Sequence, residues 1–169
     1  MLFRSDTFSV LLDTYLDNRN AFVFRVNPRG TRFDALVRNE SRFYYSDWDE
    51  QWTAAATQSD TGWSVEIASP FKTLRFRNAQ TQTWGLNFER VIKRKNEMAY
   101  WSGWSRNFTF HNVSQAGRLG GLTGIKQVER LRFRPYLLAG GEKLSAVSSP
   151  SGARAIREIG VDDLKWRSE

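Results

Sequence analysis

Apolar and polar residues alternate at every second position in several short runs of the chain. In residues 7–15, Phe8, Val10 and Leu12 share one side of the alternation, and residues 21–26 repeat the pattern with Phe, Phe and Val. Side chains of a β-strand point to opposite faces in turn, so a period of two predicts strands with one buried face. Helical periodicity is scarce, and the chain is therefore expected to be all-β.

Turn signals separate these runs at short intervals. Residues 17–20 (DNRN) and 27–30 (NPRG) favour tight turns, and Gly30 tolerates a positive φ. Further strands are predicted over residues 31–37, 52–58, 63–68, 84–92 and 99–104, with a loop over 39–50, a hairpin turn at 60–62, one helical turn after Pro70 and a glycine-rich return over 117–124. We therefore predict an antiparallel β-sandwich of the jelly-roll kind.

The chain is expected to divide near residue 125. Residues 1–125 carry the sandwich pattern, whereas residues 126–169 contain two further strand-like runs around a Gly- and Ser-rich stretch at 140–152. A two-stranded ribbon is marginally stable by itself. We interpret residues 126–169 as a linker followed by one or two strands of a truncated second β domain.

Composition narrows the possible chemistry. The 169 residues include no Cys, which excludes disulfides and thiolate metal sites, and a single histidine, His111, which excludes a His cluster for zinc. The net charge of +7 is uneven, because residues 1–66 carry 7 Lys/Arg against 10 Asp/Glu and residues 67–169 carry 18 against 8. A basic second half is compatible with nucleic acid, an anionic membrane surface or acidic glycans.

Membrane and export signals are not evident. Asp6 and Asp13 interrupt the apolar stretch at the start of the chain, so we expect no secretory signal peptide in it. The chain also has no apolar run long enough to span a bilayer as a helix.

Four stretches carry a resemblance to a known family. They are residues 8–15 (FSVLLDTY), 24–31 (FRVNPRGT), 62–76 (GWSVEIASPFKTLRF) and 84–90 (WGLNFER). In this order and spacing they resemble the family nine carbohydrate-binding modules, in the version that precedes an outer-membrane β-barrel domain of unknown function. The chain departs from the family in lacking the strands upstream of Phe8 and in having Ser69 where an aliphatic residue usually precedes Pro70.

The resemblance implies a two-sheet sandwich in the periplasm or at the outer membrane. Its expected partners are a glycan and the barrel part of its own chain, with a role in glycan recognition or carbohydrate catabolism. Nucleic acid is not expected as a partner. A module of this kind is not itself an enzyme.

Aromatic and planar polar side chains suggest where a sugar would bind. Trp101, Trp104 and Arg106 offer a clamp, and Asn87 and Arg90 lie on the neighbouring predicted strand. Aromatic rings stack on the apolar face of a pyranose, and planar polar groups bond its hydroxyls. The alternative is that these tryptophans pack inside the fold, as we expect for Trp63 and Trp84, which are in phase with aliphatic residues.

Other candidate sites have simpler explanations. Asp13 and Asp17 offer oxygen ligands for calcium, as the resemblance allows, but no calcium-loop spacing is present. Glu66 and Glu89 lie on the polar sides of their strands and offer a carboxylate pair for glycoside hydrolysis, although surface glutamates are the default. His111 is expected in a loop, and the basic run at residues 90–95 (RVIKRK) on a solvated strand end.

The sequence thus favours a non-catalytic carbohydrate-binding module. The alternatives are a structural or accessory domain of a barrel protein without sugar affinity, an activity associated with glycoside hydrolysis and, ranked last, a basic nucleic-acid binder.

Overall fold

Antiparallel strands dominate the computed structural model, which describes residues 5–103 and 105–127. The strands are β1 (Thr7–Asp13), β2 (Ala21–Val26), β3 (Arg32–Arg38), β4 (Phe43–Tyr45), β5 (Thr53–Ser59), β6 (Gly62–Ala68), β7 (Thr81–Ile92), β8 (Glu97–Tyr100) and β9 (Gly117–Thr123). Three single 3₁₀ turns connect them: η2 (Phe71–Thr73), η3 (Lys93–Lys95) and η4 (Val113–Gln115). Strands make up 49% of the described residues and α-helix none, so the all-β prediction is confirmed.

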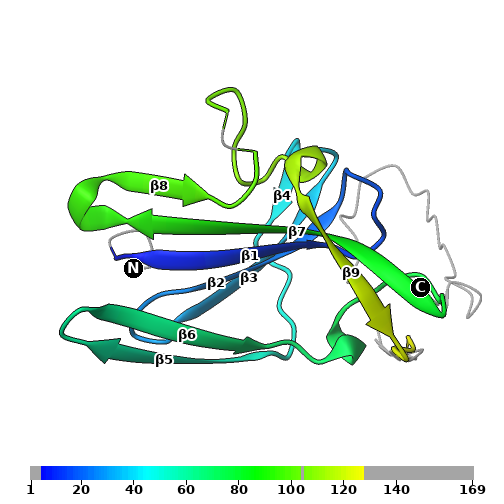
Figure 1. Cartoon of the computed structure of the whole chain (residues 1–169), viewed down its shortest axis with the longest axis horizontal. Helices are drawn as coiled ribbons and strands as arrows, with labels where there is room; N and C mark the ends of the chain where they lie inside the picture. The colour runs from blue at the N-terminus through cyan, green and yellow to red at the C-terminus, as the bar shows by residue number, and fades with distance from the viewer. Residues whose placement is uncertain (1–4, 104, 128–169) are drawn as a thin grey trace, which may run out of the picture. The chain divides into compact units, whose positions relative to one another are not determined.

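The larger sheet has the strand order β4-β3-β2-β1-β7-β8 (Figure 1). Its first three pairings are hairpins between neighbours in sequence, and the turns of the β1–β2 and β2–β3 hairpins lie where the turn signals predicted them. Gly30 closes the β2–β3 turn with φ of +77° and donates its N–H to the carbonyl of Asn27 at 2.9 Å. The strand β4 was not predicted and lies within the expected loop at residues 39–50.

The long strand β7 organises the other half of this sheet. One edge of β7 pairs with β1, and the other edge pairs first with β9 and then with β8. Between these two partners, the amide of Asn87 fills the gap: it donates to the carbonyl of Ser102 at 3.1 Å and accepts the N–H of Ser102 at 3.0 Å. The side chain of Asn87 is only 1% exposed and so fixes the segment that follows β8.

The β5–β6 hairpin forms the second sheet and covers part of one face of the first. Its half-buried Val65 and Ile67 pack against a core of large apolar side chains. This core consists of Phe24, Val26, Trp52, Leu74, Phe76 and Trp84. Trp84 is therefore a core residue, and the sandwich prediction is confirmed in outline.

The opposite face of the larger sheet is covered by the segment between β8 and β9. This segment buries Phe110 and Val113 against Leu11, Val23 and Val37. Both faces of the central strands are therefore covered. Residues 7, 9, 11 and 13 of β1 are fully buried, whereas the apolar side chains at positions 8, 10 and 12 on the opposite face are half-buried.

A glycine at the centre of the sheet gives a test of this packing. A Cβ atom on Gly85 would lie 2.9 Å from Cβ of Asp13 and 3.5 Å from Cβ of Ala116. Because a close-packed interior has no room for the extra methyl group, Gly85→Ala is expected to lower the free energy of unfolding by about 1–3 kcal/mol in chemical denaturation. The control is Gly62→Ala, where nothing lies within 4 Å, and its effect should stay under about 0.5 kcal/mol. Equal effects would contradict this packing.

Residues 128–169 lie outside the described part of the chain. The predicted linker and second β domain at 126–169 therefore stay a prediction. Of these residues the structure describes 126 and 127, and the side-chain oxygen of Gln127 accepts the N–H of Phe76 at 3.2 Å. Residues 5–103 and 105–127 contain no helix that could span a lipid bilayer.

Candidate functional site

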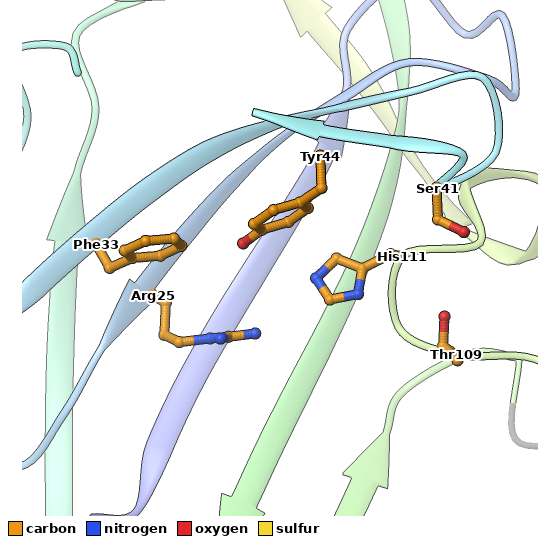
Figure 2. Close-up of a pocket in the computed structure, with 6 residues that line it drawn as sticks. All are labelled: Arg25, Phe33, Ser41, Tyr44, Thr109 and His111. Atoms are coloured by element: carbon orange, nitrogen blue, oxygen red, sulfur yellow. The ribbon is translucent and has the colours of Figure 1, made fainter. Parts of the chain in front are cut away.

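A cleft of about 400 Å³ opens on the face of the larger sheet that the β8–β9 segment covers (Figure 2). Three parts of the chain form it: the strands β2 and β3, the β3–β4 turn with β4, and the segment before η4. The lining residues are Arg25, Phe33, Ser41, Tyr44, Thr109 and His111. A volume of this size falls within the range of small-molecule sites.

Three rings stand in a row along the cleft. The Phe33 and Tyr44 rings are nearly parallel, with centroids 6.4 Å apart and an interplanar angle of 12°. The His111 ring meets Tyr44 edge-on, with centroids 5.1 Å apart. Figure 2 shows these rings with the side chain of Arg25 extended beside them. The cleft therefore combines flat apolar surface with hydroxyl and guanidinium groups.

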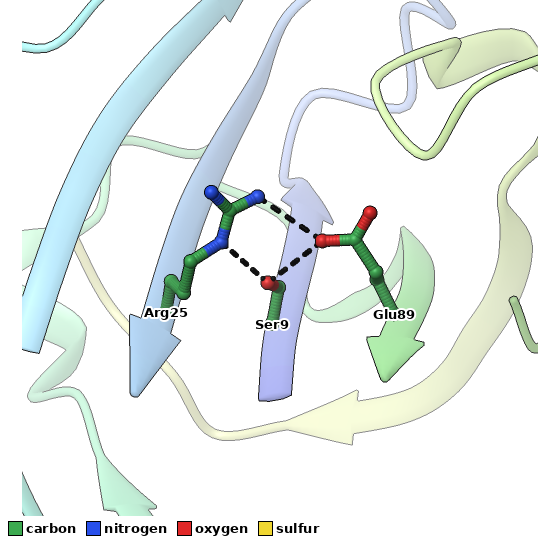
Figure 3. Close-up of polar contacts among 3 residues, drawn as sticks. All are labelled: Ser9, Arg25 and Glu89. Atoms are coloured by element: carbon green, nitrogen blue, oxygen red, sulfur yellow. Dashed lines mark hydrogen bonds and ion pairs between the residues drawn. The ribbon is translucent and has the colours of Figure 1, made fainter. Parts of the chain in front are cut away.

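Arg25 is held in place by a polar network that spans three adjacent strands (Figure 3). Its Nε donates to Oγ of Ser9 at 2.8 Å, and its Nη2 lies 3.0 Å from Oε1 of Glu89. Ser9 in turn donates to the same carboxylate oxygen at 3.1 Å. Ser9 is the direct register partner of both Arg25 and Glu89, so the sheet itself sets this geometry.

The titratable side chains of the cleft are uncharged or paired at neutral pH. Burial lowers the pKa of His111 from 6.5 to about 4, and the positive charge of Arg25 adds to the effect. Burial also raises the pKa of Tyr44. Because the charge of Arg25 is balanced by Glu89, the cleft offers hydrogen-bonding groups without a net charge.

The Nε2 atom of His111 adds one unsatisfied polar group to this site. It is buried and has no hydrogen-bond partner among the residues that the structure describes. A buried polar atom left unbonded is costly, so such atoms are rare and often belong to sites where a water or ligand bonds to them.

The predicted sugar residues that the structure describes do not form one site, because they lie on both faces of the sheet. Asn87 is buried on the cleft side of β7 and bonded to Ser102, so it positions the backbone rather than facing a ligand. Arg90 lies on the opposite side of β7 and is exposed, and Arg106 is exposed in the segment after β8. Trp104 lies outside the described residues.

Of the predicted sugar residues, Trp101 is the one whose surroundings best suit stacking against a sugar ring. Its side chain is 55% exposed, and its ring lies so close to the backbone of Gly117 that a Cβ there would come within 2.3 Å of it. The Trp101 ring also contacts Phe88, with centroids 5.8 Å apart. Phe88 and Arg90 are two residues apart on β7, so Trp101 and Arg90 share the face opposite the cleft.

The predicted calcium ligands serve the turn between β1 and β2. The carboxylate of Asp13 accepts the N–H groups of Asp17 and Asn18 at 3.2 and 2.7 Å. Asp17 accepts the N–H groups of Arg19 and Asn20, both at 2.8 Å. Within the described residues there is no group of three or more His, Cys, Asp or Glu side chains placed to hold a metal ion.

The expectation that Glu89 lies on a polar, solvated strand face is wrong. Glu89 is buried and paired with Arg25, because the β8–β9 segment covers its side of the sheet. Glu66 is exposed on β6, in the other sheet. The two carboxylates therefore lie in different sheets, one buried and one exposed. The basic residues 93–95 are exposed, as predicted for a solvated strand end.

Comparison of the chain with protein-family models, curated protein sequences and solved structures finds no match. The resemblance to the family nine modules therefore stays a prediction, and the candidate site rests on its own geometry.

Sequence reasoning missed the cleft, although one signal pointed to it. Arg25 is the one charged residue in the otherwise apolar strand β2. A charge inside such a strand suggests a buried partner of opposite charge, since an unpaired charge is rarely buried. Phe33, Tyr44 and His111 gave no comparable signal, because only the folded chain brings them together.

Proposed function

We propose that this protein is a non-catalytic binding module that holds an uncharged sugar of one or two rings in the cleft. The observation that carries the proposal is a row of aromatic rings beside an arginine whose charge is already balanced. Sugar sites need ring faces for stacking and planar donors for hydroxyl groups. Phe33 and Tyr44 supply the first, and Arg25 supplies the second.

The charge state of the cleft favours a neutral glycan over an anion. A phosphate or carboxylate gains most from an unpaired guanidinium, whereas the guanidinium of Arg25 already faces Glu89 at 3.0 Å. His111 is neutral above a pKa of about 4 and adds no positive charge. The periplasmic or outer-membrane location and the barrel partner belong to the same proposal, and they are supported by the family resemblance alone.

Calorimetric titration with soluble cello-, xylo- and malto-oligosaccharides tests the proposal, with an oligogalacturonate as the acidic comparison. At least one neutral glycan is expected to bind more tightly than the acidic one. Tyr44→Ala should weaken that binding by about tenfold or more, since it removes the central ring of the row. Trp101→Ala serves as the matched control, because its ring lies on the other face of the sheet, and it should bind like the wild type.

Two outcomes would contradict this proposal. Absence of heat with every glycan would remove the binding function and leave a structural module as the better hypothesis. Loss of binding in Trp101→Ala, with normal binding in Tyr44→Ala, would move the sugar to the Trp101 and Arg90 surface that the sequence suggested. Thermal melts of both variants check that folding is intact.

A further inference from the structure

The carboxylate of Glu40 joins two of the three parts of the chain that form the cleft: the β3–β4 turn at residues 39–42, which we call the first wall, and the segment at residues 109–112, which we call the second wall. Glu40 lies in the β3–β4 turn, directly before the cleft residue Ser41. Its Oε1 accepts the N–H of Ser114 at 2.7 Å, and its Oε2 accepts the hydroxyl of Ser114 at 3.3 Å and the side-chain amide of Asn112 at 3.5 Å. One side chain thus bonds the β3–β4 turn to the segment that enters η4.

Asn112 extends these bonds into the cleft. Its side-chain oxygen accepts the N–H and the hydroxyl of Thr109 at 2.7 and 3.1 Å. Thr109 and His111 both line the cleft, and both lie within the loop that these bonds close, residues 109–112. The position of the second wall therefore depends on Asn112, and through it on Glu40.

The backbone around Glu40 adopts a conformation that needs outside support. Asn39, Glu40 and Ser41 have φ angles of 52°, 57° and 67°, so three consecutive non-glycine residues are left-handed. The Cβ atom makes this region unfavourable, and such strain persists only where surrounding contacts hold it. The bonds of Glu40 to Ser114 and Asn112, with its N–H donated to the carbonyl of Arg19 at 3.0 Å, are contacts of this kind.

We propose that Glu40 is a positioning residue that holds the two walls together and keeps the cleft at its binding width. Without the carboxylate, the turn relaxes and the segment carrying His111 moves away from Tyr44. The inference deepens the proposed function and rests on it for any effect on glycan affinity. Its effect on the cleft itself needs no ligand.

The ligand-free test uses His111 as a reporter of cleft closure. The chain has one histidine, so its ring protons can be assigned directly by NMR. Burial holds the wild-type pKa near 4. In Glu40→Ala the midpoint should rise toward 6.5, by about one pH unit or more, because the ring becomes solvated. Glu66→Ala removes a glutamate from the exposed face of β6 and should leave the midpoint unchanged.

Two further variants keep the test decisive if Glu40→Ala folds poorly. Asn112→Ala breaks the same connection from the other side and should also raise the His111 midpoint. Glu40→Gln keeps an oxygen that can accept the N–H of Ser114, so its His111 midpoint should lie between those of the wild type and Glu40→Ala. An unchanged midpoint in both Glu40→Ala and Asn112→Ala would overturn the role of Glu40.

Glycan titration separates this inference from the proposed function. With a neutral oligosaccharide that binds the wild type, Glu40→Ala should bind about tenfold more weakly and Glu66→Ala equally well. If no oligosaccharide binds the wild type, the proposed function fails, and the His111 midpoints still decide whether Glu40 closes the cleft. Unchanged affinity in Glu40→Ala would overturn its positioning role in binding.

Discussion

Replacing Glu89 with alanine is expected to lower the free energy of unfolding by about 3–5 kcal/mol, the usual cost of leaving one partner of a buried ion pair alone. The Glu89 side chain is 7% exposed and that of Arg25 is 14% exposed. With the carboxylate gone, the guanidinium keeps its bond to Ser9 but has no counter-charge. Urea denaturation of wild type and variant, fitted to a two-state transition, measures the loss.

A surface ion pair of the same protein provides the matched control. Lys95 and Glu97 lie 3.7 Å apart with side chains about half exposed. Exposed pairs contribute about 1 kcal/mol or less, so Glu97→Ala should have a small effect. Replacing both buried partners, as Arg25→Met with Glu89→Leu, should recover much of the stability, because an apolar pair avoids the unpaired charge. A Glu89→Ala effect no larger than that of Glu97→Ala would contradict burial of this pair.

The strands that could be predicted from the sequence are those whose position and pairing depend on residues close together in the chain. For the β5–β6 hairpin, the turn at residues 60–62 and the alternation within β6 are both local features of the sequence, and the structure pairs the two strands as expected. The short strand β4 escaped prediction because its three residues, Phe43, Tyr44 and Tyr45, show no alternation. Its existence depends on pairing with β3 rather than on its own sequence.

Burial of polar residues could not be predicted in the same way. A serine, an asparagine or a glutamate in an alternating strand suggests the solvent side, yet Ser9, Asn87 and Glu89 are buried. Each is satisfied by a hydrogen bond to a residue distant in sequence. The β8–β9 segment covers these residues, and its sequence has no strand or helix periodicity from which its position over the sheet could be predicted. For the same reason, no sequence pattern could place His111 beside Tyr44.

The second large effect expected is a pH-dependent loss of stability that originates at His111. The folded protein binds a proton on this ring only near pH 4, whereas the unfolded chain binds it near 6.5. Between these values the unfolded state holds more protons, so lowering the pH favours unfolding. Stability from the neutral imidazole is therefore complete above about pH 6.5 and declines toward pH 4. The total loss of free energy of unfolding is about 3 kcal/mol, taking 1.36 kcal/mol for each pKa unit.

Comparison with His111→Phe isolates this contribution from the other titrating groups. Burial raises the pKa of Asp13 and Asp34, and these carboxyls act in the opposite direction, since the folded state then binds protons more readily. The phenylalanine variant keeps both carboxyls and a ring beside Tyr44 but cannot titrate. The free energy of unfolding of the wild type minus that of the variant should therefore fall by about 3 kcal/mol between pH 7 and pH 4 and stay constant below pH 4. A free-energy difference that does not change with pH would mean that the His111 ring is solvated in the folded state. The cleft would then be more open than the contacts of this ring with Tyr44 and Phe110 indicate.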